Sequence, residues 1–251
     1  CPLLDQAFAV QFPAMLIKIH IRHPQIEAEK EGIISFTAGQ FIRVGMDLGD
    51  ERVGRPYSLV NPPHEPLLEI FFNIVPEGPL SRELAALEVG DRIWLTDAAN
   101  GFLTLSEVPA HVSDLWLLAT GTGVGPFLSM LQTDDPWQRF ERVVLGYGVR
   151  FAKNIGYVDL ISELQRRHPE RFHFVPFVTG ERVDGALPGR IPQSLADGTL
   201  EHRVGKTLDA ARSHVMLCGH SGMITDAVEA YFSAADGDWV LVIDDATHLA
   251  P

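Results

Sequence analysis

The chain has 251 residues, of which 46% are hydrophobic and 21% charged, which is enough for one large or two modest globular domains. Its formal net charge of −13 argues against general nucleic-acid binding, because that activity needs a basic surface. No apolar run approaches the roughly 18 residues of a membrane span. The two cysteines, Cys1 and Cys218, exclude a disulfide framework and a four-cysteine iron–sulfur site. We expect a protein of the reducing cytoplasm, with no membrane segment and no secretory signal.

The first 110 residues predict a small antiparallel β-barrel. Alternating apolar residues indicate a half-buried strand at residues 15–21, and further runs indicate strands at 39–44, 69–75 and 91–95. Turn residues separate these runs at short intervals, as in small antiparallel barrels. One helix is predicted at residues 81–87, with Ser81 as its N-cap and with Leu84 and Leu87 at helical spacing.

The second half alternates between strand and helix patterns, which predicts a parallel sheet with helices on both faces. Tyr157, Leu160, Ile161 and Leu164 have the spacing of an amphipathic helix. We expect the domain boundary near residues 107–113, with residues 1–110 forming the first domain and 111–251 the second. The predicted strands are 115–119, 142–147, 172–178 and 214–218, and further helices are predicted at 126–131 and 221–232.

A glycine turn, Ala-Thr-Gly-Thr-Gly-Val-Gly-Pro at residues 119–126, follows an apolar strand and precedes a predicted helix. Glycines let the backbone N–H groups approach a phosphate closely, and the start of a helix favours an anion. Such turns also occur in α/β proteins that bind nothing at this point. The turn alone therefore leaves phosphate binding and a purely structural role equally open.

Two segments of the first half carry groups suited to a nucleotide-like cofactor. Arg55 offers a bidentate partner for a pyrophosphate, Tyr57 a flat face for a heterocycle, and Ser58 a hydroxyl for a ring nitrogen. The alternative for this segment is an edge strand with a surface arginine and a packed tyrosine. The turn at residues 77–82 offers N–H groups and Ser81 for a second phosphate contact, or Ser81 is a plain N-cap.

Taken together, these segments resemble the ferredoxin–NADP reductase family, and most closely its bacterial ferredoxin/flavodoxin reductases. The resemblance covers nearly the whole chain in order. Residues 55–58 are similar to the family's flavin motif, 71–74 to its flavin-contacting strand, and 78–81 to its pyrophosphate turn. Residues 119–126 are similar to its NADP-pyrophosphate loop, and 218–223 to its Cys-Gly-x-x-x-Met segment near the nicotinamide.

The resemblance implies an N-terminal flavin-binding β-barrel followed by a Rossmann-like domain for the nicotinamide nucleotide, with FAD and NADP(H) as cofactors. It also implies hydride exchange between NADP(H) and the flavin, and single-electron exchange with a ferredoxin or flavodoxin. In this reading Ser58 and Cys218 are the catalytic residues, at the flavin N5 and at the hydride-transfer site. The flavin-binding residues implied are Arg55, Pro56, Tyr57, Ser58, Phe71, Phe72, Asn73, Ile74, Gly78, Leu80 and Ser81. Those implied for the nicotinamide nucleotide are Gly121, Thr122, Gly123, Arg150, Thr179, Arg182, Arg190, Cys218, Gly219 and Met223.

The chain departs from the family pattern at two places. Bacterial relatives usually carry Ser-Arg where this chain has Thr179-Gly180, so the preference for NADPH over NADH depends on Arg150, Arg190 and a substitute role for Arg182. Many relatives end on an aromatic residue stacked on the flavin, whereas residues 246–251 contain none. We expect aliphatic or histidine atoms on that flavin face, and the proton donor stays open among Asp244, Asp245, Thr247 and His248.

The expected partner is acidic, so docking on a chain of charge −13 requires a local cationic face. We expect a transient electrostatic complex, a monomeric reductase and a rate that falls as salt rises. Candidates for the cationic face are Arg82, Arg92, Lys153, Arg166 and Arg167.

Other functions remain open at this point. They are an NAD(P)H-dependent reductase component of an oxygenase and a non-catalytic flavin or nucleotide redox sensor. A hydrolase is weaker, because Met223 stands where a nucleophile elbow needs glycine, and no histidine pair has the spacing of a metal site.

Overall fold

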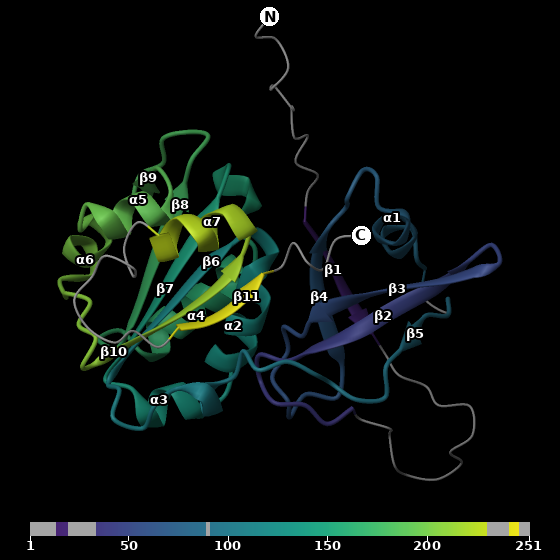
Figure 1. Cartoon of the computed structure of the whole chain (residues 1–251), viewed down its shortest axis with the longest axis horizontal. Coiled ribbons are helices and arrows are strands. Elements are labelled where there is room, and N and C mark those ends of the chain that lie inside the picture. The colour runs from purple at the N-terminus through teal and green to yellow at the C-terminus, as the bar shows by residue number, and fades with distance from the viewer. Residues whose placement is uncertain (1–13, 20–33, 89–90, 230–240, 246–251) are drawn as a thin grey trace, which may run out of the picture.

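The computed structural model describes residues 14–19, 34–88, 91–229 and 241–245. Figure 1 shows two parts side by side: an antiparallel part made of β1 to β5 with α1, and an α/β part made of β6 to β11 with the remaining helices. The predicted residues 20, 21 and 230–232 lie outside the described ranges, as does the tail at 246–251. Among the helices described, none is both long and apolar enough to cross a lipid bilayer.

The antiparallel part consists of two small sheets around one core. β1 (Ala14–Ile19) pairs with β4 (Leu68–Asn73), while β2 (Phe41–Leu48) lies between β3 (Glu51–Ser58) and β5 (Trp94–Leu95). Bridges Leu59–Ile70 and Phe41–Asn100 supplement the two sheets. The shared core contains Ile42, Val44, Leu59, Leu68, Ile70, Phe72, Leu80 and Leu84.

The motif at residues 55–58, which falls between the predicted strands at 39–44 and 69–75, lies within an additional strand, β3. β3 pairs with β2 along its whole length, from Glu51 opposite Leu48 to Ser58 opposite Phe41. β3 is an edge strand of its sheet, so Pro56, which has no N–H to donate, is tolerated there. The tight turn that joins the strands contains Gly49 in the left-handed region, with φ of 65°.

The N-cap prediction for Ser81 is wrong. Helix α1 (Pro79–Ala85) begins two residues earlier, with Gly78 as N-cap and Pro79 in its first turn. The Ser81 hydroxyl instead accepts a hydrogen bond from the Val75 N–H over 2.9 Å. Because proline has no N–H and a fixed φ, it suits the first helical position, where that donor has no partner within the helix.

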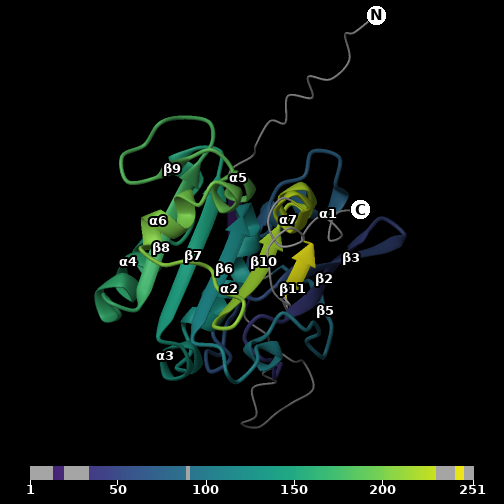
Figure 2. The same ribbon diagram turned by 60° about the vertical axis from the view of Figure 1, so that its left-hand side comes forward.

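The α/β part has a parallel sheet with the strand order β11-β10-β6-β7-β8-β9, which confirms the predicted strand–helix alternation (Figure 2). The strands are β6 (Asp114–Thr120), β7 (Arg142–Val149), β8 (Phe172–Val178), β9 (Leu187–Pro188), β10 (Ser213–Gly219) and β11 (Leu241–Asp245). The helices are α2 (Gly125–Leu131), α3 (Asp135–Arg139), α4 (Val158–Arg167), α5 (Ile191–Ala196), α6 (Thr199–Val204) and α7 (Ser221–Ala227). Short 3₁₀ turns cover Leu105–Glu107, Gly121–Val124 and Ala152–Asn154.

Helices cover both faces of the parallel sheet, as predicted. Successive residues of a strand point to opposite faces, so Leu115 and Leu117 join the cluster under α2 and α4, while Trp116 and Leu118 join the cluster under α5, α6 and α7. Ile161 and Leu164 of the predicted amphipathic helix are buried in the first cluster. The sheet is therefore covered on each side by its own apolar layer.

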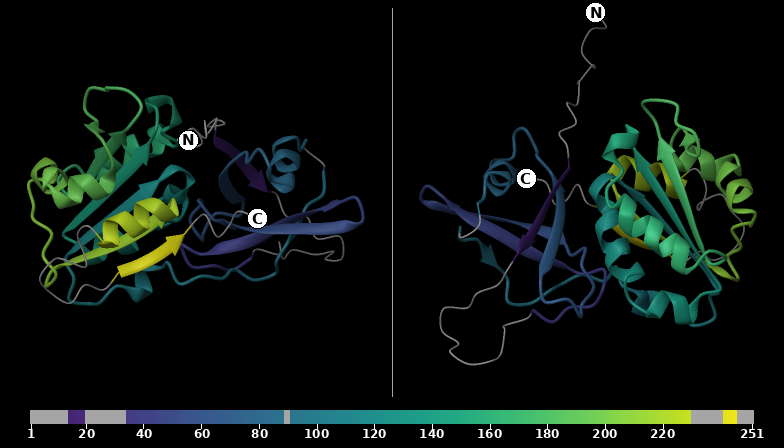
Figure 3. Two further views of the ribbon diagram at one scale, coloured as in Figure 1. Left: turned by 45° about the horizontal axis from the view of Figure 1, so that its top comes forward. Right: turned by 180° about the vertical axis from the view of Figure 1, so that it is seen from behind.

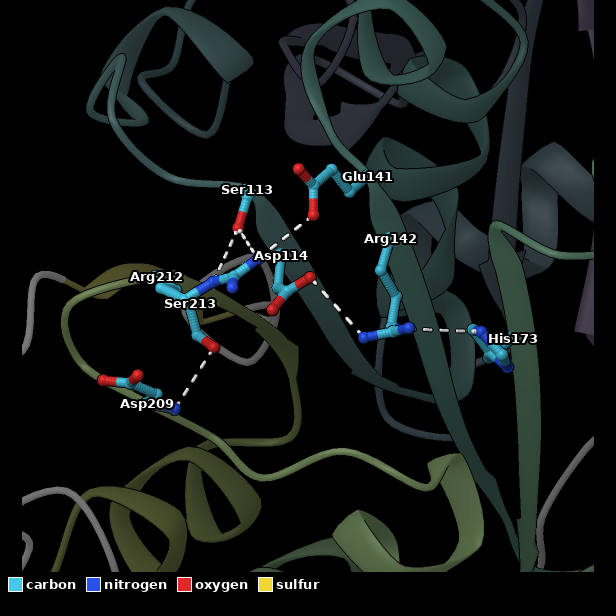
Figure 4. A network of polar contacts seen from close by, with 8 residues as sticks. All are labelled: Ser113, Asp114, Glu141, Arg142, His173, Asp209, Arg212 and Ser213. Atoms are coloured by element: carbon cyan, nitrogen blue, oxygen red, sulfur yellow. Dashed lines mark hydrogen bonds and ion pairs between the residues drawn. The ribbon is translucent and has the colours of Figure 1, made fainter.

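Polar side chains join the amino-terminal ends of the strands, away from the strand ends that carry the glycine turn (Figure 4). Arg142 of β7 lies 3.7 Å from the Asp114 carboxylate and 3.4 Å from Nε2 of His173 on β8. Arg212 donates to Ser113 over 2.9 Å and pairs with Glu141 over 3.0 Å. This network connects the starts of β6, β7, β8 and β10, so the other end of the sheet is free to form a ligand site.

Candidate nucleotide and flavin site

A cavity of about 530 Å³ lies at the carboxyl ends of the parallel strands. This edge is where open α/β sheets bind their ligands. Of the predicted residues, Asn73, Gly121, Thr122, Arg150, Thr179, Arg190, Gly219 and Met223 line it. The cavity is also lined by residues that were not among the predicted site residues: Thr120, Gly148, Val149, Phe177, Gly189, Ile191 and His220.

The glycine turn folds as a 3₁₀ turn (Gly121–Val124) leading into α2. Gly121 has φ of 56°, a conformation that residues with a Cβ rarely adopt. A Cβ on Gly123 would stand 2.6 Å from the carbonyl oxygen of Cys218 and 2.7 Å from Cα of Gly219. The missing side chains therefore let the turn lie directly against the end of β10, with open space on the cavity side.

The predicted nicotinamide residue Cys218 does not line this cavity. It is 1% exposed and belongs to the core cluster under α2 and α4. Its neighbour Gly219, with φ of 142°, and Met223 of α7 reach the cavity wall in its place. His220, which caps α7 by accepting a hydrogen bond from the Gly222 N–H, lies beside them.

Two of the three predicted arginines reach the cavity and the third does not. Arg150 follows β7 with its guanidinium 5.4 Å from the ring centre of Phe151. Arg190 precedes α5 and pairs with Asp226 over 2.6 Å. The exposed Arg182 is absent from the cavity wall.

The departure at Gly180 has a steric cause. The Gly180 N–H donates to the Arg150 carbonyl over 2.7 Å, and a Cβ at position 180 would stand 2.7 Å from that same oxygen. It would also stand 2.8 Å from the Phe151 ring. The Arg150–Phe151 pair therefore occupies the space that a side chain at position 180 needs.

The predicted flavin motif lies next to the glycine turn. Gly125, at the start of α2, has its Cβ position 3.3 Å from Val60 and 4.0 Å from the Ser58 side chain. Tyr57 packs edge-on against Phe72, with ring centres 5.7 Å apart, and burial raises the pKa of its hydroxyl to about 12. The Arg55 guanidinium donates to the Gly54 carbonyl of its own strand over 2.9 Å.

β4, the strand predicted to contact the flavin, has some side chains in the core of the antiparallel part and others against the α/β part. Phe72 is 3% exposed in the core of the antiparallel part, whereas Phe71 packs on Gly156 and edge-on against Tyr157 of the α/β part. Asn73 lines the cavity, and Ile74, half-buried, follows the strand. Side chains 71 and 72 are therefore already packed against protein.

The predicted pyrophosphate turn is closed by its own hydrogen bonds. The Gly78 N–H donates to the Val75 carbonyl over 3.0 Å, and Ser81 accepts from Val75 as described above. Leu80 is 2% exposed in the core, so only its backbone is available to a ligand.

Three comparisons with known proteins agree with this geometry. Residues 117–229 match the family described as "Oxidoreductase NAD-binding domain". The flavodoxin/ferredoxin–NADP reductase of Escherichia coli (strain K12) is 43% identical over 194 residues, which cover 77% of this chain and 78% of that protein. The ferredoxin–NADP reductase of Pseudomonas aeruginosa is 30% identical over 201 residues, covering 77% of each chain. A crystal structure of a ferredoxin NADP+ reductase from Neisseria gonorrhoeae, with bound FAD and NADP, superimposes with a TM-score of 0.80 at 28% identity and covers 94% of this chain and 96% of that chain.

The parallel sheet, the glycine turn and the matched domain define an oxidoreductase with a nicotinamide-nucleotide-binding α/β part. Sequence identity to reductases over about three quarters of the chain identifies the family within this class. The chain belongs to the flavodoxin/ferredoxin–NADP reductase family, which confirms the resemblance inferred from its motifs.

Proposed function

We propose that this protein is a flavin-dependent oxidoreductase that uses FAD to exchange reducing equivalents between NADP(H) and a ferredoxin or flavodoxin. The observation that carries the proposal is the proximity of Ser58, at the end of the predicted flavin motif, to Gly125 of the glycine turn: the Ser58 Cβ lies 4.0 Å from the point where a Cβ on Gly125 would stand. This arrangement brings a segment suited to a flavin next to a turn suited to a dinucleotide. Relatives of this chain are named flavodoxin/ferredoxin–NADP reductase and ferredoxin–NADP reductase.

The residues present fit the two cofactors. The missing side chain of Gly121 gives a phosphate in the cavity access to backbone N–H groups, and Arg150 and Arg190, which also line the cavity, supply positive charge. On the flavin side, Arg55 has the charge for a pyrophosphate, and the half-buried Tyr57 offers a flat ring face for a heterocycle. When bound, the flavin and the nicotinamide supply the hydride and single-electron chemistry.

The roles left to the protein are positioning and exclusion of water. We infer that Ser58 holds a hydrogen bond on the flavin side and that Thr122 and Met223 limit the space on the nicotinamide side. Cys218 keeps β10 packed against Gly123, so its part in the reaction is through the backbone of the cavity wall.

We further propose that the antiparallel part is a closed barrel forming a flavin domain up to residue 110, with residues 111–251 as the nucleotide domain. The acidic partner is held transiently by Arg82, Arg92 and Lys153 on a monomeric reductase. Arg166 and Arg167 are weaker candidates because both pair with Glu163 on α4.

The test is an absorption spectrum of the purified protein, followed by turnover with NADPH. Flavin bands near 380 and 450 nm (roughly the values of any flavoprotein, since the chromophore belongs to the cofactor) together with rapid ferricyanide reduction are expected. The Arg55→Ala variant should lose flavin. The control variant, Arg52→Ala, removes another arginine of β3, whose guanidinium stacks on Trp94 of β5, and should retain flavin. A colourless protein that resists reconstitution with FAD contradicts the proposal, and a yellow protein with slow turnover indicates a redox sensor.

A further inference from the structure

One face of β4 lies against the α/β part. Because strand residues alternate between faces, Glu69, Phe71 and Asn73 share one side, and Ile70 and Phe72 point into the core of the antiparallel part. Figure 3, in its right-hand view, shows β4 on the side of the antiparallel part that faces the α/β part. All three residues of the outer face meet that part, each at a different point.

Glu69 makes the first of these contacts. Its carboxylate accepts a hydrogen bond from the Tyr157 hydroxyl over 2.5 Å, although the residue is only 7% exposed. Its backbone is also fixed, because its N–H donates to the Asn61 side chain over 2.8 Å and its carbonyl accepts from Val60 over 2.9 Å. The Asn61 carbonyl in turn accepts from Ser129 of α2 over 2.7 Å, so Glu69 is fixed to two elements of the α/β part.

Tyr157 is held in a backbone conformation that costs free energy. Its φ of 60° and ψ of 32° lie in the left-handed region, and within the described ranges it is the one residue other than glycine with positive φ. Such a conformation costs about 1 kcal/mol or more, so surrounding contacts have to maintain it. Those contacts are the bond to Glu69 and the edge-on packing on Phe71, whose ring centre is 5.2 Å away. Gly156 leaves the space for that ring, since a Cβ there would stand 2.7 Å from it.

The third residue of this face lies at the cavity. Asn73 lines it, with its side-chain nitrogen 4.0 Å from the Cβ position of Gly121 in the glycine turn. Asn73 lies four residue steps along the strand from Glu69, a distance of about 13 Å, so a shift of β4 at one end moves the other. The Glu69–Tyr157 contact therefore sets where the antiparallel part meets the glycine turn.

We propose that Tyr157 and Glu69 are a positioning pair that fixes the spacing between the flavin side and the nicotinamide side of the site. This inference rests on the proposed function, because the spacing matters only if a reaction crosses it. Neither Glu69 nor Tyr157 lines the cavity, so loss of their hydrogen bond should leave the binding of each cofactor intact and slow the step between them. A misplacement of about 1 Å can slow such a step by up to about 100-fold.

The test compares Tyr157→Phe, which removes only the hydroxyl, with Tyr147→Phe as the matched control. Tyr147 carries a buried hydroxyl that accepts from the Gly156 N–H over 3.4 Å inside the α/β part. We expect Tyr157→Phe to keep its flavin content and its NADP+ dissociation constant. Its rate of flavin reduction by NADPH in stopped flow should fall at least threefold, and amide hydrogen exchange should rise in residues 69–73 and 150–157. Glu69→Gln retains an oxygen acceptor for Tyr157, so its rate of flavin reduction should be closer to the wild-type rate than that of Tyr157→Phe.

The experiment distinguishes failure of the positioning pair from failure of the proposed function. If the wild type binds FAD and oxidises NADPH while Tyr157→Phe matches Tyr147→Phe in both reduction rate and exchange, the positioning pair is overturned and the proposed function stands. If the wild type neither binds FAD nor oxidises NADPH, the proposed function falls and this inference falls with it.

Discussion

The backbone N–H of His220 donates a hydrogen bond to the side-chain oxygen of Thr120 over 2.9 Å, across the carboxyl ends of β6 and β10. Thr120 is the last residue of β6 before the glycine turn, and His220 follows the last residue of β10. The bond therefore ties the turn that approaches the phosphates to the segment that leads into α7. Both residues line the cavity, so this bond connects two parts of its wall.

The Thr120→Val substitution should loosen this part of the cavity wall. Valine has nearly the same shape but leaves the His220 N–H without its partner, which costs about 0.5–1.5 kcal/mol. We expect NADP+ to bind several-fold more weakly, as measured by titration of the flavin spectrum. Thr120→Ser keeps the hydroxyl and serves as the control. Equal affinities for valine and wild type would contradict a role for this bond.

Selection of NADPH over NADH should depend on Arg150 and not on Arg182. Arg150 lines the cavity and is supported by Phe151 and Gly180, whereas Arg182 does not line it. A charge-assisted bond to a phosphate contributes about 1.5–3 kcal/mol, so Arg150→Ala should raise the KM for NADPH by about tenfold or more. The KM for NADH should change little, because NADH has no 2′-phosphate. An equal effect from Arg182→Ala would show that the nucleotide lies elsewhere.

Sequence patterns predicted the four central strands of the parallel sheet because their signals are local, but they did not predict its two edge strands, β9 and β11. The runs at 115–119, 142–147, 172–178 and 214–218 are almost wholly apolar, and the strands differ from them by at most two residues at either end. The antiparallel strands were harder, because β3 has polar and half-buried residues throughout and one proline. Its hairpin turn at Gly49-Asp50 was the signal that could have revealed it.

The site was predictable where glycines or charges identify it, and not where two distant segments meet. Phe71 and Phe72 are both apolar, so the pattern cannot tell which one faces the core and which one meets Tyr157. Likewise, nothing in the sequence near Tyr157 indicates positive φ, since the conformation depends on Glu69, which lies 88 residues earlier in the chain. Contacts between the two parts therefore had to come from the structure.

Arg139 should hold the segment that leads into the α/β part. Its guanidinium donates to the carbonyl oxygens of Leu105 over 2.7 Å and Val108 over 3.0 Å. Arg139→Met keeps the length of the side chain but removes both bonds, and the Leu105 carbonyl keeps only the Val108 N–H as a donor. The free energy of unfolding should therefore fall by about 1–3 kcal/mol in urea titrations. Asp135→Asn, which removes only the half-exposed ion pair at 3.7 Å, should cost less than about 1 kcal/mol. A similar loss in both variants would place the effect in the ion pair.

His214 should make the protein less stable in mild acid. The residue is 1% exposed in β10, no described residue pairs with its Nε2, and burial together with the charge of Arg139 lowers its pKa to about 4. Between pH 6.5 and pH 4 the unfolded chain, with a histidine pKa near 6.5, binds more protons than the folded protein does. The stability that the neutral buried histidine contributes is therefore fully present above pH 6.5 and is lost as the pH falls from 6.5 to 4. The loss amounts to at most about 3 kcal/mol. In His214→Leu, urea titrations from pH 7 to pH 4.5 should give a smaller decline than in wild type, while removal of the exposed His111 by His111→Gln should leave the decline unchanged. Parallel declines in wild type and His214→Leu would show that other groups cause the acid sensitivity.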